Sequence, residues 1–263
     1  MSGHTSKMPI CACSVILPEN QDKKKDMKLF QKNSMINLWR NIRYNLKIIF
    51  AGKFFWFLVA SFAFYLFFAI MEVINNQSIG EGDIYNLMLF PGVLLVFYPS
   101  VFGIQNDEDS RILEILFGIP NYRYKVWLVR LMMIFIQVFI ILIGYGYLSS
   151  LLLYPVNPLE MAIQLMFPVG FLGTAAFMFS TVIKNGNGTA VVMILAGVAL
   201  LIMADALERS QWNIFLNPLE LPDNFNPIIW SGIVTRNRIF LGVGMVIFLL
   251  YGLFNLQKRE RFV

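Results

Sequence analysis

The chain is organised by long stretches without charged residues, separated by short polar segments. A helix that crosses the about 30 Å hydrocarbon core of a bilayer needs about 20 apolar residues, and six of the stretches meet or nearly meet that length. They are continuous apolar runs, unlike the alternating segments of a membrane β-barrel. The pattern predicts an all-α integral membrane protein with six transmembrane helices, near 54–74, 84–104, 127–149, 160–183, 188–205 and 239–257.

The composition agrees with this pattern and excludes a soluble globule. Of the 263 residues, 57% are hydrophobic and only 14% are charged, whereas soluble domains carry about 25% charged residues. A net charge of +5 would suggest nucleic-acid binding in a soluble protein. In a membrane protein the basic residues instead set the orientation, so we expect the lipid bilayer as a partner and no nucleic acid.

The distribution of basic residues predicts which side of the membrane each segment faces. Of the 21 Lys and Arg residues, only Arg209, Arg236 and Arg238 lie in the segments after the first, third and fifth spans. All the others precede the first span, follow the second, fourth or sixth, or lie at the start of the third. Under the positive-inside rule, this predicts a multi-pass protein of the cell (inner, cytoplasmic) membrane with both termini in the cytoplasm.

The polar region before the first span divides into two parts. Residues 1–32 are expected to form a disordered cytoplasmic arm, and residues 33–263 the six-span domain. The stretch 33–52 carries apolar residues at spacings of three and four, which favours an amphipathic helix on the inner leaflet, although a basic flank that only fixes topology would look similar. The apolar positions are Met35, Leu38, Trp39, Ile42, Leu46 and Ile49.

A short cytoplasmic segment between the second and third spans has a helical pattern of its own. Acidic residues open it, which favours a helix N-terminus, and Gly118 and Pro120 end it. Four apolar residues between them share one face: Ile112, Ile115, Leu116 and Ile119. This face must be buried, either against the protein's own helices or in a groove of a cytosolic partner. The pattern alone leaves both open.

The same segment resembles the motif that follows the second span in type-2 ATP-binding-cassette (ABC) permeases: acidic residue, Leu-Glu-x-Leu, Pro, then Arg. The six spans, the preceding amphipathic helix and the long loop before the last span are also similar. Ser110-Arg111-Ile112 departs from the family's usual Gly-Thr at helix entry. The resemblance implies a coupling helix that docks on an ATPase through Glu108, Arg111, Leu113, Glu114, Leu116, Pro120 and Arg123.

The resemblance also implies the partners of the chain. It predicts two copies of a separate ABC ATPase subunit, which carry the ATP and Mg, and a second permease, identical or related. The chain itself has no G-x-x-x-x-G-K-[ST] stretch, and no paired carboxylates, Ser–His or Cys–His set within one leaflet. We therefore predict no enzyme activity and no catalytic, cofactor-binding or metal-binding residue in this chain.

Polar residues within and between the spans are candidates for a pathway or gate. Glu72, Gln137 and Asp205 are selected because ionisable and amide groups are costly in a bilayer. Residues 205–238 form an apolar outer loop, predicted to hold re-entrant or interfacial helices, with an ordinary interfacial loop as the alternative. We expect Pro91, Pro99 and Pro168 to kink their spans.

Two functions from different classes fit these observations. The first is the transmembrane permease subunit of an ABC transporter, an exporter that moves a hydrophobic or amphipathic substrate. The alternative is a six-span membrane scaffold or assembly protein without transport. The discriminating feature is whether the segment 108–125 docks an ATPase.

Overall fold

The computed structural model describes residues 54–74, 79–109, 123–183, 185–222 and 225–259. These residues form helices and connecting turns, with no strand among them. The helices are α2 (Phe54–Ile74), α3 (Glu81–Asp109), the π-helix η1 (Arg123–Leu128), α5 (Val129–Leu152), α6 (Pro158–Ile183), α7 (Gly186–Ala206) and α8 (Pro227–Arg259). The predicted arm 1–32 and the predicted amphipathic helix 33–52 lie outside the described residues.

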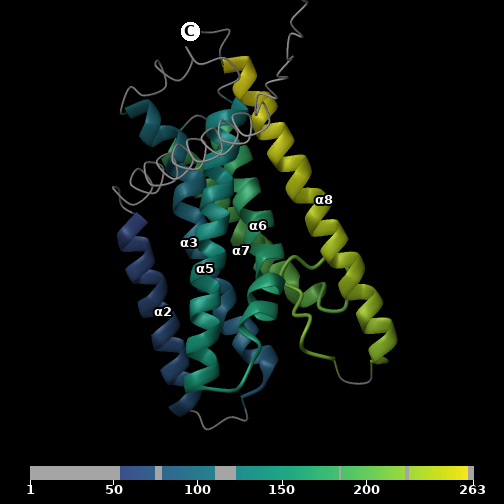
Figure 1. The fold of residues 1–263 in the computed structure, drawn as a ribbon. Helices are drawn as coiled ribbons and strands as arrows, with labels where there is room; N and C mark the ends of the chain where they lie inside the picture. Colours follow the sequence, from purple (N-terminus) through teal and green to yellow (C-terminus); the bar gives the residue numbers. More distant parts are fainter. Residues whose placement is uncertain (1–53, 75–78, 110–122, 184, 223–224, 260–263) are drawn as a thin grey trace, which may run out of the picture. The chain divides into compact units, whose positions relative to one another are not determined.

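Six of these helices are long and apolar enough to cross a membrane, which confirms the all-α, multi-pass prediction. The helices alternate in direction, so that α2 begins and α8 ends at the same end of the bundle (Figure 1). We name this the Trp127 end, after a residue of η1. The opposite end, where α3, α6 and α8 begin, is named the Arg238 end after a residue of α8. The sequence predicts that the Trp127 end faces the cytoplasm.

Helix α6 lies at the centre of the bundle and contacts α3, α5, α7 and α8. In the most apolar stretch of α6, 67% of the residues are buried, whereas in the corresponding stretch of α7 only 11% are buried. Small residues permit this packing. A Cβ atom at Gly173 would lie 2.7 Å from Val96 Cγ2 of α3 and 2.9 Å from a ring carbon of Phe135 of α5, so the close approach requires glycine.

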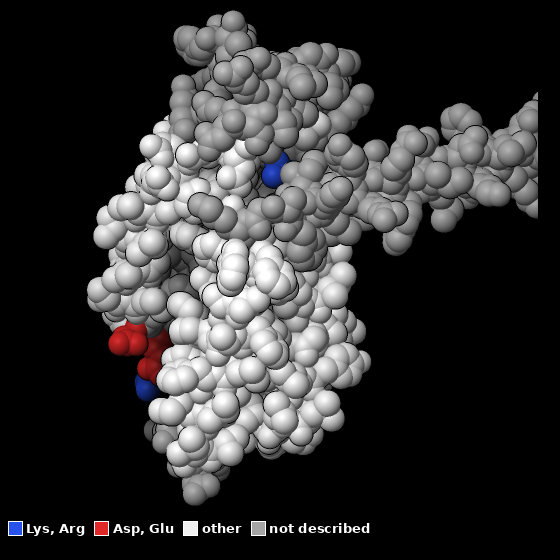
Figure 2. Space-filling view, turned by 90° about the vertical axis from the view of Figure 1, so that its left-hand side faces the viewer, with Lys and Arg blue, Asp and Glu red and all other residues white. Residues whose placement is uncertain are grey.

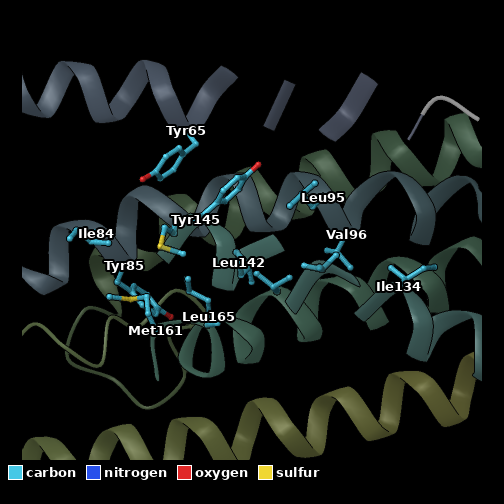
Figure 3. Close-up of a cluster of buried hydrophobic side chains, with 14 of the residues drawn as sticks. Tyr65, Ile84, Tyr85, Leu95, Val96, Ile134, Leu142, Tyr145, Met161 and Leu165 are labelled. Carbon is cyan, nitrogen blue, oxygen red and sulfur yellow. The ribbon is translucent and has the colours of Figure 1, made fainter. Parts of the chain in front are cut away.

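A large hydrophobic cluster joins α2, α3, α5 and α6 (Figure 3). The rings of Tyr65 on α2 and Tyr145 on α5 stack at 4.9 Å between centroids. Tyr65 Oη lies 2.7 Å from Ser149 Oγ, and Ser61 Oγ donates to the Pro91 carbonyl at 3.2 Å. These bonds attach the otherwise apolar α2 to the bundle.

The outward faces of the helices are apolar, as a bilayer requires. Large hydrophobic side chains are exposed along α7 and α8, among them Ile202 at 71% and Ile228 at 80%. Figure 2 shows one side of the protein, on which the described surface is mostly uncharged, with acidic residues gathered in one place. Hydrophobicity alone therefore does not distinguish core from surface in this chain, because the hydrocarbon of a bilayer is as apolar as a protein core.

The last helix begins earlier than the sequence predicts. The span was predicted at 239–257, but α8 starts at Pro227. Asn226 Oδ1 accepts a hydrogen bond from the Ile228 backbone N–H at 2.9 Å, so Asn-Pro forms the N-cap and first residue of the helix. The prediction was wrong because Arg236 and Arg238 were assigned to the loop.

The outer loop is correspondingly shorter than predicted. Between α7 and α8, residues 207–222 and 225–226 form turns and irregular backbone, with no helix among them. The predicted re-entrant or interfacial helices are therefore not found in this part of the loop. The loop still folds inward, because Ile214 and Leu216 are only 8% and 2% exposed.

Candidate functional site

The π-helix η1 directly follows the predicted coupling segment. π-helices are rare and are frequent at functional sites. Trp127 of η1 is 3% exposed and belongs to an apolar cluster that draws on four other helices, α3, α5, α6 and α8. This cluster, named here the inner cluster, consists of Ile104, Trp127, Leu131, Phe177, Leu253 and Leu256.

The inner cluster holds Trp127 of η1 by packing. The Trp127 ring lies 6.4 Å from that of Phe177 between centroids, and the Arg130 guanidinium lies 5.5 Å from the Trp127 ring centroid. Neither Trp127 Nε1 nor Ser100 Oγ has a partner among the described residues. Both residues line a cavity of about 10 Å³, which has room for about one water molecule.

Directional bonds tie the neighbouring helices to one another at this end. Gln105 Oε1 of α3 accepts from the Gly186 N–H of α7 at 2.6 Å. Asn255 Nδ2 of α8 donates to the Thr181 carbonyl of α6 at 2.9 Å. The helices α3 and α7, and likewise α6 and α8, are thus joined by polar contacts, whereas Trp127 of η1 contributes an apolar surface to them.

The predicted coupling residues are placed by the backbone only in part. Glu108 lies in the last turn of α3 and Arg123 is the first residue of η1, so the segment 110–122 connects these two elements. The structure describes only the backbone of Glu108 and Arg123, not their side chains. The remaining predicted coupling residues lie outside the described residues altogether. Those residues are Arg111, Leu113, Glu114, Leu116 and Pro120.

A polar cluster lies at the opposite end around a buried arginine. Arg238 of α8 is 8% exposed. Its Nε donates to Gln164 Oε1 of α6 at 3.0 Å, and its Nη1 donates to Asn237 Oδ1 at 3.1 Å. Its Nη2 lies 3.5 Å from Tyr85 Oη and 3.5 Å from the Leu216 carbonyl oxygen. No carboxylate among the described residues pairs with it; neutral acceptors and the Phe167 ring, whose centroid lies 5.4 Å from Arg238 Cζ, stabilise the charge instead. We name the side chains of Tyr85, Gln164, Asn213, Asn237 and Arg238 the outer cluster.

The outer cluster also fixes the irregular loop. Asn237, with no exposed surface, donates through Nδ2 to the carbonyls of Gln211 at 2.9 Å and Asn213 at 2.7 Å. Asn217 Nδ2 donates to the Gly82 carbonyl of α3 at 2.9 Å. Because non-helical backbone is tolerated at membrane depth only where its polar groups are satisfied by protein or water, these amides explain how the loop folds between α3 and α8.

Sequence analysis did not identify the outer cluster as a site. It counted Arg238 only as a loop charge, and it assigned no role to Asn237, Gln164 or Tyr85. The sequence did contain a signal, the Asn237-Arg238 pair at the start of a long apolar run. An ionisable residue at the edge of a span needs a partner that stabilises its charge, so these two positions could have been proposed as part of a polar site.

The three predicted pathway residues are not brought into one site. Asp205 lines a cleft of about 460 Å³ between the end of α7 and the loop, and neither of the other two lines it. Glu72 is half-buried near the end of α2. Gln137 of α5 is 9% exposed, and its Oε1 accepts no hydrogen bond from any described residue.

Within the part of the chain that the structure describes, no group of three or more His, Cys, Asp or Glu side chains is arranged to hold a metal ion. Comparison of the sequence with family models finds no match, and searches of curated proteins and of solved structures find none either.

Proposed function

We propose that the chain is the transmembrane permease subunit of an ABC transporter, working as an exporter of a hydrophobic or amphipathic substrate. In this proposal both termini face the cytoplasm of the cell membrane. The proposal rests on the six apolar helices, on the motif-like segment after the second span, and on the way the ends of that segment connect to the bundle.

The observation that carries the proposal is the packing of η1, the described element that directly follows the segment 110–122. The segment leaves α3 at Asp109 and enters η1 at Arg123. The π-helix then packs through Trp127 against Phe177 of α6 and Leu253 of α8. A displacement of the segment by a cytoplasmic partner would therefore reach the central helix and the last helix directly, which is what a coupling element must achieve.

The partners follow from the same proposal. Two ATPase subunits bind ATP and Mg and dimerise, and each pushes on one permease. A second permease, identical or related, completes the pathway, since a pair of six-span bundles can enclose a gated passage at its interface. ATP then shifts the population between two arrangements of the bundle through the differential contacts of the ATPases with each arrangement.

Co-purification in a mild detergent tests the proposal most simply. We expect a nucleotide-binding subunit to accompany the wild-type chain extracted from its native membrane. Leu116→Asp and Glu114→Lys should lose that subunit while inserting normally, because both alter the proposed docking face. Glu160→Lys is the matched control: it reverses an exposed charge at the Arg238 end and should retain the subunit.

The alternative scaffold function predicts a different result from the same experiment. A scaffold or assembly protein would be accompanied by proteins without nucleotide-binding activity, and the Glu114 and Leu116 variants would not change ATP hydrolysis in the purified material. Such a result would overturn the transporter proposal and leave the six-span fold intact.

A further inference from the structure

A groove lies on the outward face of α8, close to the Arg238 end. Its volume is about 370 Å³, and it is lined by Gln211, Trp212, Arg236, Ile239, Phe240 and Val243. The four α8 residues are spaced by three, one and three positions, so they share one face of the helix. Ile239 and Val243 are 61% and 53% exposed. The groove therefore has an apolar wall along α8 with a basic residue at one end.

The loop after α7 forms the second wall of this groove, and contacts with α8 hold it in place. The Trp212 and Phe240 rings pack edge to face, with their centroids 4.9 Å apart. The Gln211 carbonyl accepts a hydrogen bond from Asn237 Nδ2 of α8 at 2.9 Å. Trp212 itself is 54% exposed, so its indole is available at the surface. The groove is thus formed by the loop and α8 together, within one chain.

Arg236 differs from the other two outer arginines, because nothing described stabilises its charge. Arg238 is held in the outer cluster, and the Arg209 guanidinium lies 5.7 Å from the centroid of the Phe225 ring. Arg236 is exposed and has no hydrogen-bond or ion-pair partner among the described residues, and the Gln211 side chain makes no hydrogen bond with them either. The groove therefore offers a positive charge and unpaired N–H donors beside an apolar wall.

The acidic residues of the same loop belong to a different hollow. No described Asp or Glu lines the groove, whereas Asp205, Glu208 and Glu220 line the cleft that includes Trp230 of α8. Trp230 and Arg236 are six positions apart, which places them about 120° apart around the helix axis. The cleft and the groove therefore lie on different sides of α8, and Arg236 is the charged group that an occupant of the groove would contact.

The position of Arg236 along α8 places it at the level of lipid headgroups. Residues 239–257 contain no charged side chain and form about 28 Å of helix, close to the about 30 Å thickness of a hydrocarbon core. Arg236 precedes this run by three residues, or about 4.5 Å. Tryptophan side chains favour the same interfacial level, which agrees with the exposed Trp212 beside it. The apolar wall then extends from the headgroup level into the hydrocarbon.

We propose that this groove binds an anionic phospholipid from the leaflet at the Arg238 end, which the sequence predicts to be the outer leaflet. The lipid phosphate accepts hydrogen bonds from the Arg236 guanidinium and the Gln211 amide, and one acyl chain lies along Ile239, Phe240 and Val243. Guanidinium groups suit phosphate oxygens because they donate two parallel N–H bonds. An anionic lipid is preferred to phosphatidylcholine, whose own cation offsets the phosphate charge.

Photo-cross-linking locates the lipid directly. The full chain is reconstituted in phosphatidylcholine bilayers that contain a trace of phosphatidylglycerol or, in parallel, of phosphatidylcholine, each with the same diazirine-bearing acyl chain. Adducts on residues 239–243 are quantified by mass spectrometry. They should be about fivefold more abundant with phosphatidylglycerol, the preference expected for one arginine beside an anionic headgroup. The exposed stretch of α7 around Leu195 and Ile202 should show no such preference.

Substitutions separate the charge from the apolar wall. Arg236→Gln, at an exposed position, should reduce the preference for phosphatidylglycerol to about one. Arg236→Lys keeps the charge without the planar fork and should retain a preference of about threefold. Arg209→Gln is the matched control: it removes an exposed charge at the same end, outside the groove, and should keep the fivefold preference.

Two results would overturn the proposal. Equal labelling of residues 239–243 by both lipids in the wild type, or an unchanged preference in Arg236→Gln, would show ordinary solvation of α8 by lipid. Labelling of α7 without labelling of residues 239–243 by either lipid would show that a second protein chain covers the groove. The lipid site requires only that α8 crosses the membrane, so this measurement and the co-purification test can fail separately.

Discussion

The two ends of the bundle are held together in different ways. In the inner cluster, the Trp127 ring packs among Phe177, Leu253 and Leu256, and its indole N–H has no described partner. In the outer cluster, the Arg238 guanidinium reaches α3, α6 and the loop by hydrogen bonds to neutral acceptors. Trp127 of η1 is thus held by packing, beside the hydrogen bonds that join α3 to α7 and α6 to α8 at the same end, whereas Arg238 is held by hydrogen bonds of its own.

This difference has a physical consequence for movement. Apolar contacts have no preferred direction, so a packed ring keeps its stabilisation wherever it finds an equally close-packed position. Hydrogen bonds weaken steeply when their geometry changes, so the outer cluster resists a small displacement and then gives way at once. A bundle that switches requires contacts that exist in two discrete arrangements, and the hydrogen bonds of the outer cluster are the contacts that such a change would break.

The largest expected effect is at the outer cluster. Arg238→Met preserves much of the side-chain length but removes the donor to Gln164 Oε1 and to Asn237 Oδ1. We expect a loss of about 3 kcal/mol in the free energy of unfolding, measured by denaturation in mixed micelles. Arg236→Met, an exposed position on the same helix, is the control and should change little. Equal effects of the two variants would remove the distinction between the ends.

The next effect tests the helix that connects both clusters, since α6 carries Gln164 at one end and Phe177 at the other. Gly173→Ala places a Cβ atom 2.7 Å from Val96 Cγ2, and we expect a cost of about 2 kcal/mol from overpacking. Gly197→Ala on α7 meets no atom within 4 Å and should be neutral or slightly stabilising. Unfolding of both variants in the same detergent provides the comparison.

A smaller effect is expected at the inner cluster. Trp127→Phe keeps an aromatic ring and breaks no hydrogen bond with any described residue, so it should cost only about 1 kcal/mol. A loss as large as that of Arg238→Met would contradict the view that the Trp127 ring is replaceable by another aromatic ring of the inner cluster. The measurement is the same unfolding titration, read by circular dichroism because the substitution removes a fluorescent residue.

The smallest effect concerns the attachment of α2. Tyr65→Phe keeps the ring stacked on Tyr145 and removes only the hydroxyl that lies 2.7 Å from Ser149 Oγ. We expect about 0.5–1 kcal/mol, checked against Ile70→Val on the exposed face of the same helix. A clearly larger loss for Tyr65→Phe would mean that α2 depends on polar contacts as the outer cluster does.

The sequence predicted the helices well because charge-free length is a strong signal in a bilayer. It failed at α8, since a charged residue was taken as the end of a span, although Arg238 is solvated within the bundle by side chains from α6 and α3. Those partners are separated from it by long stretches of chain, and local patterns carry no information about such contacts. The inner cluster was missed for the same reason: Trp127 and Leu253 meet only through tertiary packing.

The central claim is that a displacement of the segment 110–122 reaches the Arg238 end of the bundle. It is tested most directly by pulsed electron paramagnetic resonance on the complex from native membranes, with spin labels at Leu151→Cys on α5 and Ser231→Cys on α8, and with Cys11 and Cys13 replaced by Ser. The account predicts that ATP changes the distribution of distances between the labels in the otherwise wild-type chain and not in Leu116→Asp. Distances that are the same with and without ATP, or that change equally in both proteins, would contradict it.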